Sequence, residues 1–380
     1  IEFMIGESSM RDGILAVIGT RPEAIKMCPL ILELGRRGER VSLCVTGQHR
    51  ELADSVLGLF GVSADYDLDV MRPGQSLGSV TAAMLCGMER VLDEAGPGLV
   101  LVHGDTATTL TAALACFYRG IPVGHVEAGL RTYDKTAPFP EEFNRRAVSL
   151  MADIHFAPTP RAARNLIAEG VDPERVFVTG NTVVDALEYT RRPDFDHEVL
   201  RASAGRQLII VTLHRRESRG ESMRRMFAEL RRLADSRKDV ALVCPLHPAP
   251  EVQTAAAPIR GAGNIFITPP LSLVDFHNLL GRSYFAVSDS GGVQEEALSL
   301  GVPVLVTRRC TERPEGIEAG GLRLVSPETL YDAAVALLDS PAAHDAMVCR
   351  VNPFGDGHAC RRIADILEMQ KNIFKLQKNY

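Results

Sequence analysis

The sequence predicts an α/β protein made of two doubly wound parallel sheets, and three observations support this prediction. Short apolar runs recur along the 380 residues, and most are continuous, as is typical of strands buried on both faces of a parallel sheet. Longer helical patterns separate these runs, which is βα repetition. A charged, irregular segment at about 186–206 interrupts the series, which then restarts. We therefore expect two Rossmann-like αβα domains, 1–186 and 187–380, with the last helix a candidate to pack back on the first domain.

Each domain shows the same succession of elements. Strands are predicted in the first domain at 14–18, 41–46, 99–104, 122–127, 154–158 and 176–180. Helical patterns there close on a glycine, a common helix C-terminus, at 26–38, 108–120 and 160–170. Strands are predicted in the second domain at 207–214, 240–247, 264–268, 284–289 and 302–307. Open α/β sheets bind ligands beyond the carboxyl ends of their strands, so a cleft between two such domains would collect the polar residues that follow strands.

Composition excludes several classes of function. The net charge is −6, no basic block occurs and tryptophan is absent, so no nucleic-acid partner is expected. No apolar run approaches the length of a membrane span. The eight cysteines are scattered without a CxxC pair, and several lie inside apolar runs. Together with the lack of a signal peptide before the first strand, this predicts reduced thiols, no metal site and a cytoplasmic protein.

Polar residues follow the first and third predicted strands. Arg21 and Lys26 lie in the turn and helix after 14–18, where helix N–H groups and two cations could hold an anion. A capped helix start with proline near its first position explains the same residues equally well. Asp105 follows the strand at 99–104, and a role as helix N-cap is the alternative to a role in a site.

Three glutamates lie in the stretch HVEAGLRTYDKTAPFPEEFNRR. Glu127 ends the strand at 122–127, and Glu141 opens a helix behind two prolines. Both are either acids and bases gathered in a cleft or solvated carboxylates that stabilise a helix start. Glu142 is expected to be no more than helix-start solvation.

In the second domain, His214 and His247 each end a predicted strand, and Arg313 lies in the loop TERPE. A lone histidine in such a place is more often structural than functional.

The segment SDSGGVQEEALSLGVP carries the sharpest local signal. Ser290, Gly291 and Gly292 separate a strand from a helix, so the backbone can approach a diphosphate closely and present the N–H groups of the helix N-terminus. Glu296, about one turn into the helix, could accept hydrogen bonds from ribose hydroxyls. The alternative is an ordinary glycine-rich turn.

These segments occur in a specific order along nearly the whole chain. The order is GTRPEAIKM, TGQHRE, VHGDTATTL, VGHVEAGLRT, PFPEEFNRR, TGNTVVDAL, HRRES, SDSGGVQEEA, TERPE and NPFGDG. In this series the sequence resembles the bacterial non-hydrolysing UDP-N-acetylglucosamine 2-epimerases, whose two Rossmann-like domains face a cleft in the GT-B fold. The resemblance implies reversible epimerisation at C2 between UDP-N-acetylglucosamine and UDP-N-acetylmannosamine, without a cofactor. In that family the C2 proton is removed and UDP leaves C1; UDP then adds back while C2 is protonated from the opposite face.

The resemblance also implies roles for individual residues. Catalytic roles fall on Asp105, Glu127, Glu141 and His214, with base and acid left unassigned among the carboxylates. Contacts to the UDP-sugar fall on Arg21, Lys26, Phe276, Ser290, Gly291, Gly292, Glu296 and Arg313. Phe276 would lie against the uracil ring, although its apolar surroundings also suit a core residue. A second UDP-N-acetylglucosamine, the activator of bacterial members, would contact Gln48, Gln75, Arg215, Glu217 and His247. The family further implies a homodimer.

Other functions remain open on the sequence. The enzyme could be a hydrolysing epimerase that releases free N-acetylmannosamine and UDP, or could act on a modified UDP-sugar. A GT-B glycosyltransferase is weaker, because that reaction does not need this set of carboxylates. A non-catalytic UDP-sugar-binding regulatory subunit is a different class, and the four catalytic candidates argue against it.

Overall fold

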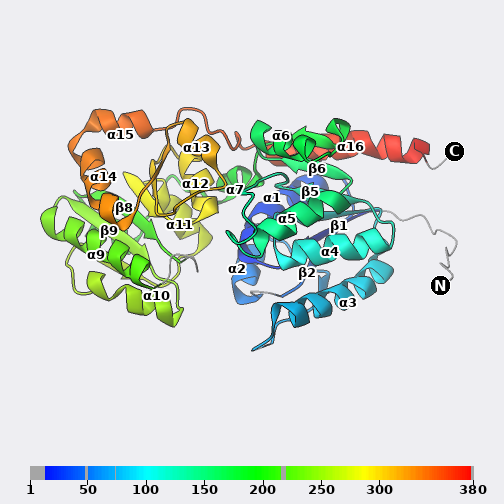
Figure 1. Ribbon diagram of the computed structural model, residues 1–380, viewed down its shortest axis with the longest axis horizontal. Helices are drawn as coiled ribbons and strands as arrows, with labels where there is room; N and C mark the ends of the chain where they lie inside the picture. The colour runs from blue at the N-terminus through cyan, green and yellow to red at the C-terminus, as the bar shows by residue number, and fades with distance from the viewer. Residues whose placement is uncertain (1–12, 48–49, 73, 215–219, 378–380) are drawn as a thin grey trace. The chain divides into compact units, whose positions relative to one another are not determined.

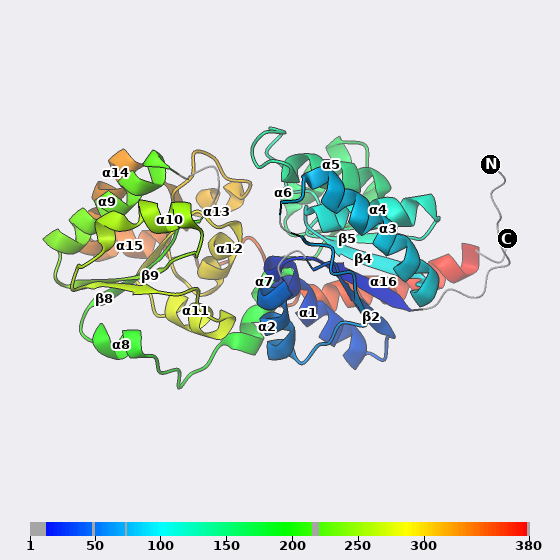
Figure 2. The ribbon, with the colours of Figure 1, turned by 90° about the horizontal axis from the view of Figure 1, so that it is seen from below.

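The computed structural model describes residues 13–47, 50–72, 74–214 and 220–377. The chain forms two compact units. One holds the chain up to Ala186 together with the residues from Gly357 onward, and the other spans Leu187–Asp356. Each unit contains a wholly parallel sheet flanked by helices, as Figures 1 and 2 show, so the predicted α/β class with two Rossmann-like domains is confirmed.

The sheet of the first unit has seven strands in the order β3-β2-β1-β4-β5-β6-β7. Its strands are β1 (Ile14–Ile18), β2 (Val41–Val45), β3 (Tyr66–Asp67), β4 (Leu99–His103), β5 (Val123–Val126), β6 (Ile154–Ala157) and β7 (Val176–Val178). The chain runs outward from β1 to β3 and returns to β4 on the other side of β1, with Ile14 opposite both Val41 and Leu99. This reversal makes the carboxyl ends of β1 and β4 the switch point where such sheets bind ligands.

Helices follow these strands through the first unit. They are α1 (Arg21–Arg36), α2 (Arg50–Phe60), α3 (Leu77–Ala95), α4 (Ala107–Tyr118), α5 (Glu141–Met151), α6 (Pro160–Ala168), the short 3-10 turn η1 (Pro173–Arg175), α7 (Thr182–Thr190) and α16 (Ala359–Gln377). Helices α3, α4 and α5 lie side by side, and their apolar residues form one core with sheet residues such as Leu15 and Val100. Both of these sheet residues are completely buried.

The C-terminal helix α16 packs on α1 of the first unit, although it comes last in the chain. Asp185 accepts hydrogen bonds from the backbone N–H groups of Ala359 and Cys360 at its start. Arg37, just after α1, donates to Asp365 of α16. The compact units therefore divide at Ala186 and again at Gly357, whereas the sequence placed all of 187–380 in one domain with this helix as a candidate exception.

The sheet of the second unit has six strands in the order β10-β9-β8-β11-β12-β13. Its strands are β8 (Gln207–Thr212), β9 (Val240–Pro245), β10 (Ile265–Thr268), β11 (Phe285–Ser288), β12 (Val304–Val306) and β13 (Leu322–Leu324). Its helices are α8 (Glu198–Ala202), α9 (Glu221–Ser236), α10 (Pro250–Ala255), η3 (Ala257–Ile259), α11 (Leu273–Leu280), α12 (Gly291–Ser299), α13 (Pro314–Glu318), α14 (Pro327–Asp339) and α15 (Pro341–Met347). The switch point here lies between β8 and β11.

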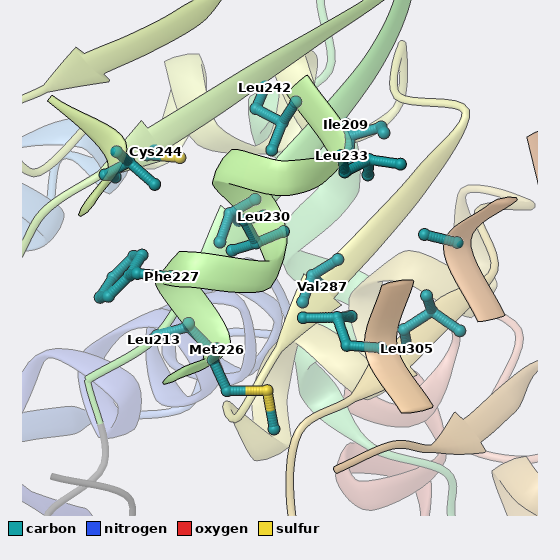
Figure 3. Packing of buried hydrophobic residues seen from close by; sticks show 14 of the residues in the cluster. Ile209, Leu213, Met226, Phe227, Leu230, Leu233, Leu242, Cys244, Val287 and Leu305 are labelled. Atoms are coloured by element: carbon teal, nitrogen blue, oxygen red, sulfur yellow. The ribbon is translucent and has the colours of Figure 1, made fainter. Parts of the chain in front are cut away.

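The core of the second unit explains why helix α9 forms and where it packs. Its apolar residues recur every three or four positions, so Phe227, Leu230 and Leu233 share one face. Figure 3 shows this face against Ile209 and Leu242 of the sheet. The neighbouring strand residues point to the opposite face and join a second core with α11 and α12, as strand alternation requires. Two packed layers hold the carboxyl ends of β8 and β11 in place.

Candidate active site

The turn from β1 into α1 is shaped by a capping box. Thr20 is the N-cap, and the Glu23 carboxylate accepts the backbone N–H groups of Gly19 at 3.0 Å and Thr20 at 2.7 Å. Burial raises the pKa of Glu23, and these hydrogen bonds oppose that rise. A side chain at Gly19 would overlap Thr108 and come 2.5 Å from the Thr46 hydroxyl, so only glycine fits. The capped helix start is thus present, and it sets Arg21 at the first helical position with Lys26 one turn further on.

Lys26 and Glu127 form a buried ion pair beyond the ends of β1 and β5. Their side chains are 7% and 8% exposed, and the Lys26 ammonium donates to Glu127 Oε2. Asn181 donates to the same oxygen at 2.6 Å, and His103 Nε2 lies 3.8 Å from it. The Glu127 carboxylate is therefore held in place from three sides.

Glu127 also adopts an unusual backbone conformation. Its φ of 63° lies in the left-handed region, which non-glycine residues seldom adopt and which costs roughly 1–3 kcal/mol. Such strain persists where the surrounding contacts fix it, and it is common at functional sites. His103 beside it is uncharged at neutral pH, because burial lowers its pKa to about 4 despite the nearby Glu127 charge.

Asp105 lies beyond the end of β4 and is fixed by helix α5. The Arg145 guanidinium pairs with its carboxylate, and the Asn144 side chain donates to its backbone carbonyl at 2.9 Å. The N-cap of α4 is the next residue, Thr106, whose hydroxyl accepts from the Thr109 N–H. Asp105 is therefore free of the capping role that the sequence offered as an alternative.

Glu141 begins α5, whose first residues have no side-chain cap, so the helix dipole favours its negative charge there. Its neighbour Glu142 is not the solvated residue that the sequence suggested. It is completely buried and accepts the N–H groups of Thr132 and Tyr133 at 3.0 and 2.9 Å. This carboxylate fixes the loop between β5 and α5, because a buried anion needs such donors.

In the second unit, His214 follows β8 and meets Asp289, which follows β11. The completely buried Asp289 accepts the backbone N–H of His214 at 2.9 Å, and its other oxygen lies 3.2 Å from Nδ1 of the ring. The Asp289 carboxylate thus faces Nδ1, which favours the imidazole tautomer that carries its proton on Nδ1. The side chain is 43% exposed, so it remains accessible to a ligand.

The glycine turn lies at the same switch point. Helix α12 begins at Gly291, and Ser290 makes no side-chain cap to its N-terminus. A side chain at Gly291 would come 2.6 Å from Nη1 of Arg313. That guanidinium is buried and donates to Glu295 and Glu312, each at 2.5 Å. Arg313 therefore packs behind the turn and neutralises two buried carboxylates.

Comparisons with known proteins show the family of this chain. Residues 33–368 match the family described as UDP-N-acetylglucosamine 2-epimerase. This chain belongs to that family. A UDP-N-acetylglucosamine 2-epimerase of Bacillus subtilis is 47% identical, covering 93% of this chain and 94% of that protein.

Two solved structures extend the similarity to the fold. The UDP-GlcNAc 2-epimerase from Neisseria meningitidis bound to UDP-GlcNAc is 41% identical with a TM-score of 0.88, covering 94% of this chain and 99% of that one. The Methanocaldococcus jannaschii UDP-GlcNAc 2-epimerase in complex with UDP-GlcNAc and UDP is 31% identical with a TM-score of 0.82, covering 94% and 99%. The family resemblance and the GT-B-like fold class expected from the sequence are thereby confirmed.

Three further predicted site residues of this epimerase family member pack against the core or bond to residues close to them in the sequence. Phe276 is half-buried and packs against the core of the second unit. Gln75 bonds to its own loop, accepting from Arg72 N and donating to the Val70 carbonyl. His247 accepts from the Ala249 N–H at 3.1 Å. The other activator residues proposed from the sequence, Gln48, Arg215 and Glu217, lie outside the described residues.

The sequence missed several residues that complete these clusters. Asn181, His103 and Asp289 each contact a predicted site residue. Asp289 had a detectable signal, because it is a charged residue at the end of an otherwise apolar strand. Among the described residues, no group of three or more histidine, cysteine or acidic side chains is arranged to hold a metal ion.

Proposed function

We propose that this chain interconverts UDP-N-acetylglucosamine and UDP-N-acetylmannosamine by eliminating UDP and adding it back. The observation that carries the proposal is the set of carboxylates beyond β4 and β5. Asp105 and Glu127 each pair with a buried cation, and Glu141 opens the neighbouring helix. An epimerase of this kind must take a proton from one face of C2 and return one to the other, which a single carboxylate cannot do.

The second unit supplies what the leaving group needs. The backbone N–H groups of Gly291 and Gly292 bind the diphosphate at the uncapped start of α12, next to Ser290, whose own N–H donates to the Ser288 hydroxyl at 3.0 Å. His214, with Asp289 behind its Nδ1, stabilises the negative charge that grows on UDP as its bond to C1 breaks.

Arg313 and Phe276 support this binding in different ways. Arg313 shapes the turn, since its guanidinium is occupied by Glu295 and Glu312. Phe276 offers the part of its ring that the core leaves exposed to the uracil.

A product balance tests the reaction. The purified protein is incubated with UDP-N-acetylglucosamine, and the phosphorus and sugar signals are followed by NMR. We expect the two UDP-sugars to approach a fixed ratio while free UDP stays at a trace level and does not accumulate with time. Free N-acetylmannosamine appearing together with equal UDP would instead make the enzyme a hydrolysing epimerase.

Glu127→Gln tests the carboxylate separately from nucleotide binding. It removes the charge and keeps the volume, so we expect turnover to fall by roughly 10²–10⁴-fold, the usual contribution of a general acid or base. UDP binding measured by calorimetry should be largely kept, because the proposed UDP-sugar contacts other than Arg21 and Lys26 lie in the second unit. Normal turnover would remove Glu127 from the mechanism.

Two further features of the family belong to the proposal. A homodimer is supported by the exposed Phe117 and Tyr118 on α4 and by Phe143 and Leu150 on the adjacent α5; sedimentation velocity would test it. Activation by a second UDP-N-acetylglucosamine would make the initial rate sigmoidal in substrate.

The location of the protein stays a prediction. No helix in the part of the chain that the structure describes is both long and apolar enough to span a membrane.

A further inference from the structure

His277 is a completely buried histidine that touches two functionally distinct segments. It lies on α11, with Nδ1 2.7 Å from the hydroxyl of Thr190 at the end of α7. Its Nε2 lies 3.4 Å from Oε2 of Glu296 on α12. This nitrogen has no aligned hydrogen bond to any described residue, so the Glu296 carboxylate is the group it faces.

The chemistry of the two neighbours fixes the proton on Nε2. A neutral imidazole carries one N–H, and a bare lone pair on Nε2 would face the Glu296 carboxylate, which is repulsive in a buried place. Nδ1 then accepts the hydroxyl proton of Thr190. That distance is shorter than the 3.3 Å from the same hydroxyl to the Leu187 carbonyl, its other acceptor.

The helix that carries His277 is itself fastened to the segment after α7. The next residue, Asn278, donates to the Thr190 carbonyl at 2.7 Å and accepts the Arg192 N–H at 2.9 Å. Two consecutive side chains of α11 thus bind the segment 190–192, where the chain enters the second unit. His277 is held on one side by this segment and aims its remaining donor at Glu296.

We propose that His277 is a positioning residue that orients the Glu296 carboxylate for the ribose of the nucleotide. The inference rests on the proposed function and on the ribose contact expected of Glu296 from the sequence. With Oε2 facing His277, Oε1 is the oxygen near Gly292, 3.4 Å from where a side chain there would begin. A carboxylate fixed before the nucleotide arrives loses less conformational freedom on binding, so affinity for the ribose hydroxyls rises.

The test compares two variants that each keep one half of the imidazole. In His277→Gln the amide nitrogen reaches the position of Nε2, and in His277→Asn the amide reaches only toward Thr190. Each full-length variant is titrated by calorimetry with UDP and with 2′,3′-dideoxy-UDP. The dissociation constant of the dideoxy nucleotide divided by that of UDP measures the contribution of the ribose hydroxyls alone.

We expect His277→Asn to weaken UDP binding several-fold, because the Glu296 carboxylate loses the group it faces at 3.4 Å and is no longer fixed before the nucleotide arrives. Binding of the dideoxy nucleotide should stay unchanged, so the ratio collapses, and His277→Gln should restore most of it. Thr190→Val, which removes the hydroxyl and keeps the shape, should lower the ratio in the same direction. In a Glu296→Gln background, His277→Asn should have no further effect.

Equal weakening of both nucleotides in His277→Asn would overturn the inference, because that is what a merely structural histidine gives. An undiminished effect in the Glu296→Gln background would also overturn it. Failure of the unaltered protein to bind UDP would overturn the proposed function as well, which separates the two outcomes.

Discussion

Lys26→Met probes the buried ion pair that holds Glu127. Both partners are less than a tenth exposed, so water cannot replace the lost ammonium. Removing one partner of such a pair costs about 3–5 kcal/mol, because the other charge is left buried without compensation. Glu127 keeps the amide of Asn181 at 2.6 Å, and hydrogen bonds to charged groups contribute about 1.5–3 kcal/mol. We therefore expect the lower end of the range, a loss of about 3 kcal/mol at pH 7.

The loss should be local to the first unit, so native-state hydrogen exchange is the suitable assay. Peptides that cover β5 and the start of α1 report the opening free energy of this region directly. Lys135→Met, at an exposed position, is the matched control and should change that free energy by less than about 0.5 kcal/mol. The double variant Lys26→Met with Glu127→Gln should regain part of the loss, since no unpaired charge remains. Equal effects of both lysine variants, or no recovery in the double variant, would refute the reasoning.

Three other perturbations follow from single contacts. Burial lowers the pKa of His103 to about 4, below its value of 6.5 in the unfolded chain, so the protein is most stable above pH 6.5 and loses stability as the pH falls toward 4. His103→Gln should flatten the dependence of the urea midpoint on pH between these two values. An unchanged dependence would contradict this expectation. Asp289→Asn should lower kcat about 10²-fold or more, because an amide no longer holds the His214 proton on Nδ1, while the dissociation constant of UDP should change only a few-fold. Steady-state kinetics and calorimetry measure the two quantities, and a normal kcat would contradict the expectation. Gly19→Ala should destabilise the protein by about 1–3 kcal/mol, because the new methyl group would overlap Thr108. Gly35→Ala lies inside α1, where a methyl group meets nothing within 4 Å, and should stabilise the protein by up to about 1 kcal/mol. A shift of the melting temperature in the same direction for both variants would contradict these expectations.

The sequence predicted the central strands because their burial leaves a local trace. The expected strand at 99–104 matches β4, and its continuous apolar run reflects cover on both faces. The edge strands β3 and β13 were not predicted. Tyr66–Asp67 is a two-residue strand, and Leu322–Leu324 has two exposed residues of three. Both lie at a sheet edge and have little apolar pattern, whereas the other two edge strands, β7 and β10, were predicted at 176–180 and 264–268 from their apolar runs.

The site was predictable where chemistry follows a strand and not where folding brings distant residues together. Glu127 and His214 were singled out because each was expected to follow a strand, and the structure places both beyond strand ends. The completely buried Glu142 was misjudged, because its partners are backbone N–H groups about ten residues earlier in a loop. Asn181 meets Glu127 from 54 positions away, and no spacing in the sequence reveals that contact.

The central claim is that C2 loses and regains its proton while UDP leaves and returns. The most direct measurement is incubation with UDP-N-acetylglucosamine in deuterated water, followed by mass spectrometry and NMR of the separated UDP-sugars. The account predicts one deuterium at C2 in both UDP-N-acetylglucosamine and UDP-N-acetylmannosamine, and none elsewhere in the sugar. Epimerisation without deuterium at C2, or the folded protein giving neither exchange nor epimer with ample UDP-N-acetylglucosamine, would contradict it.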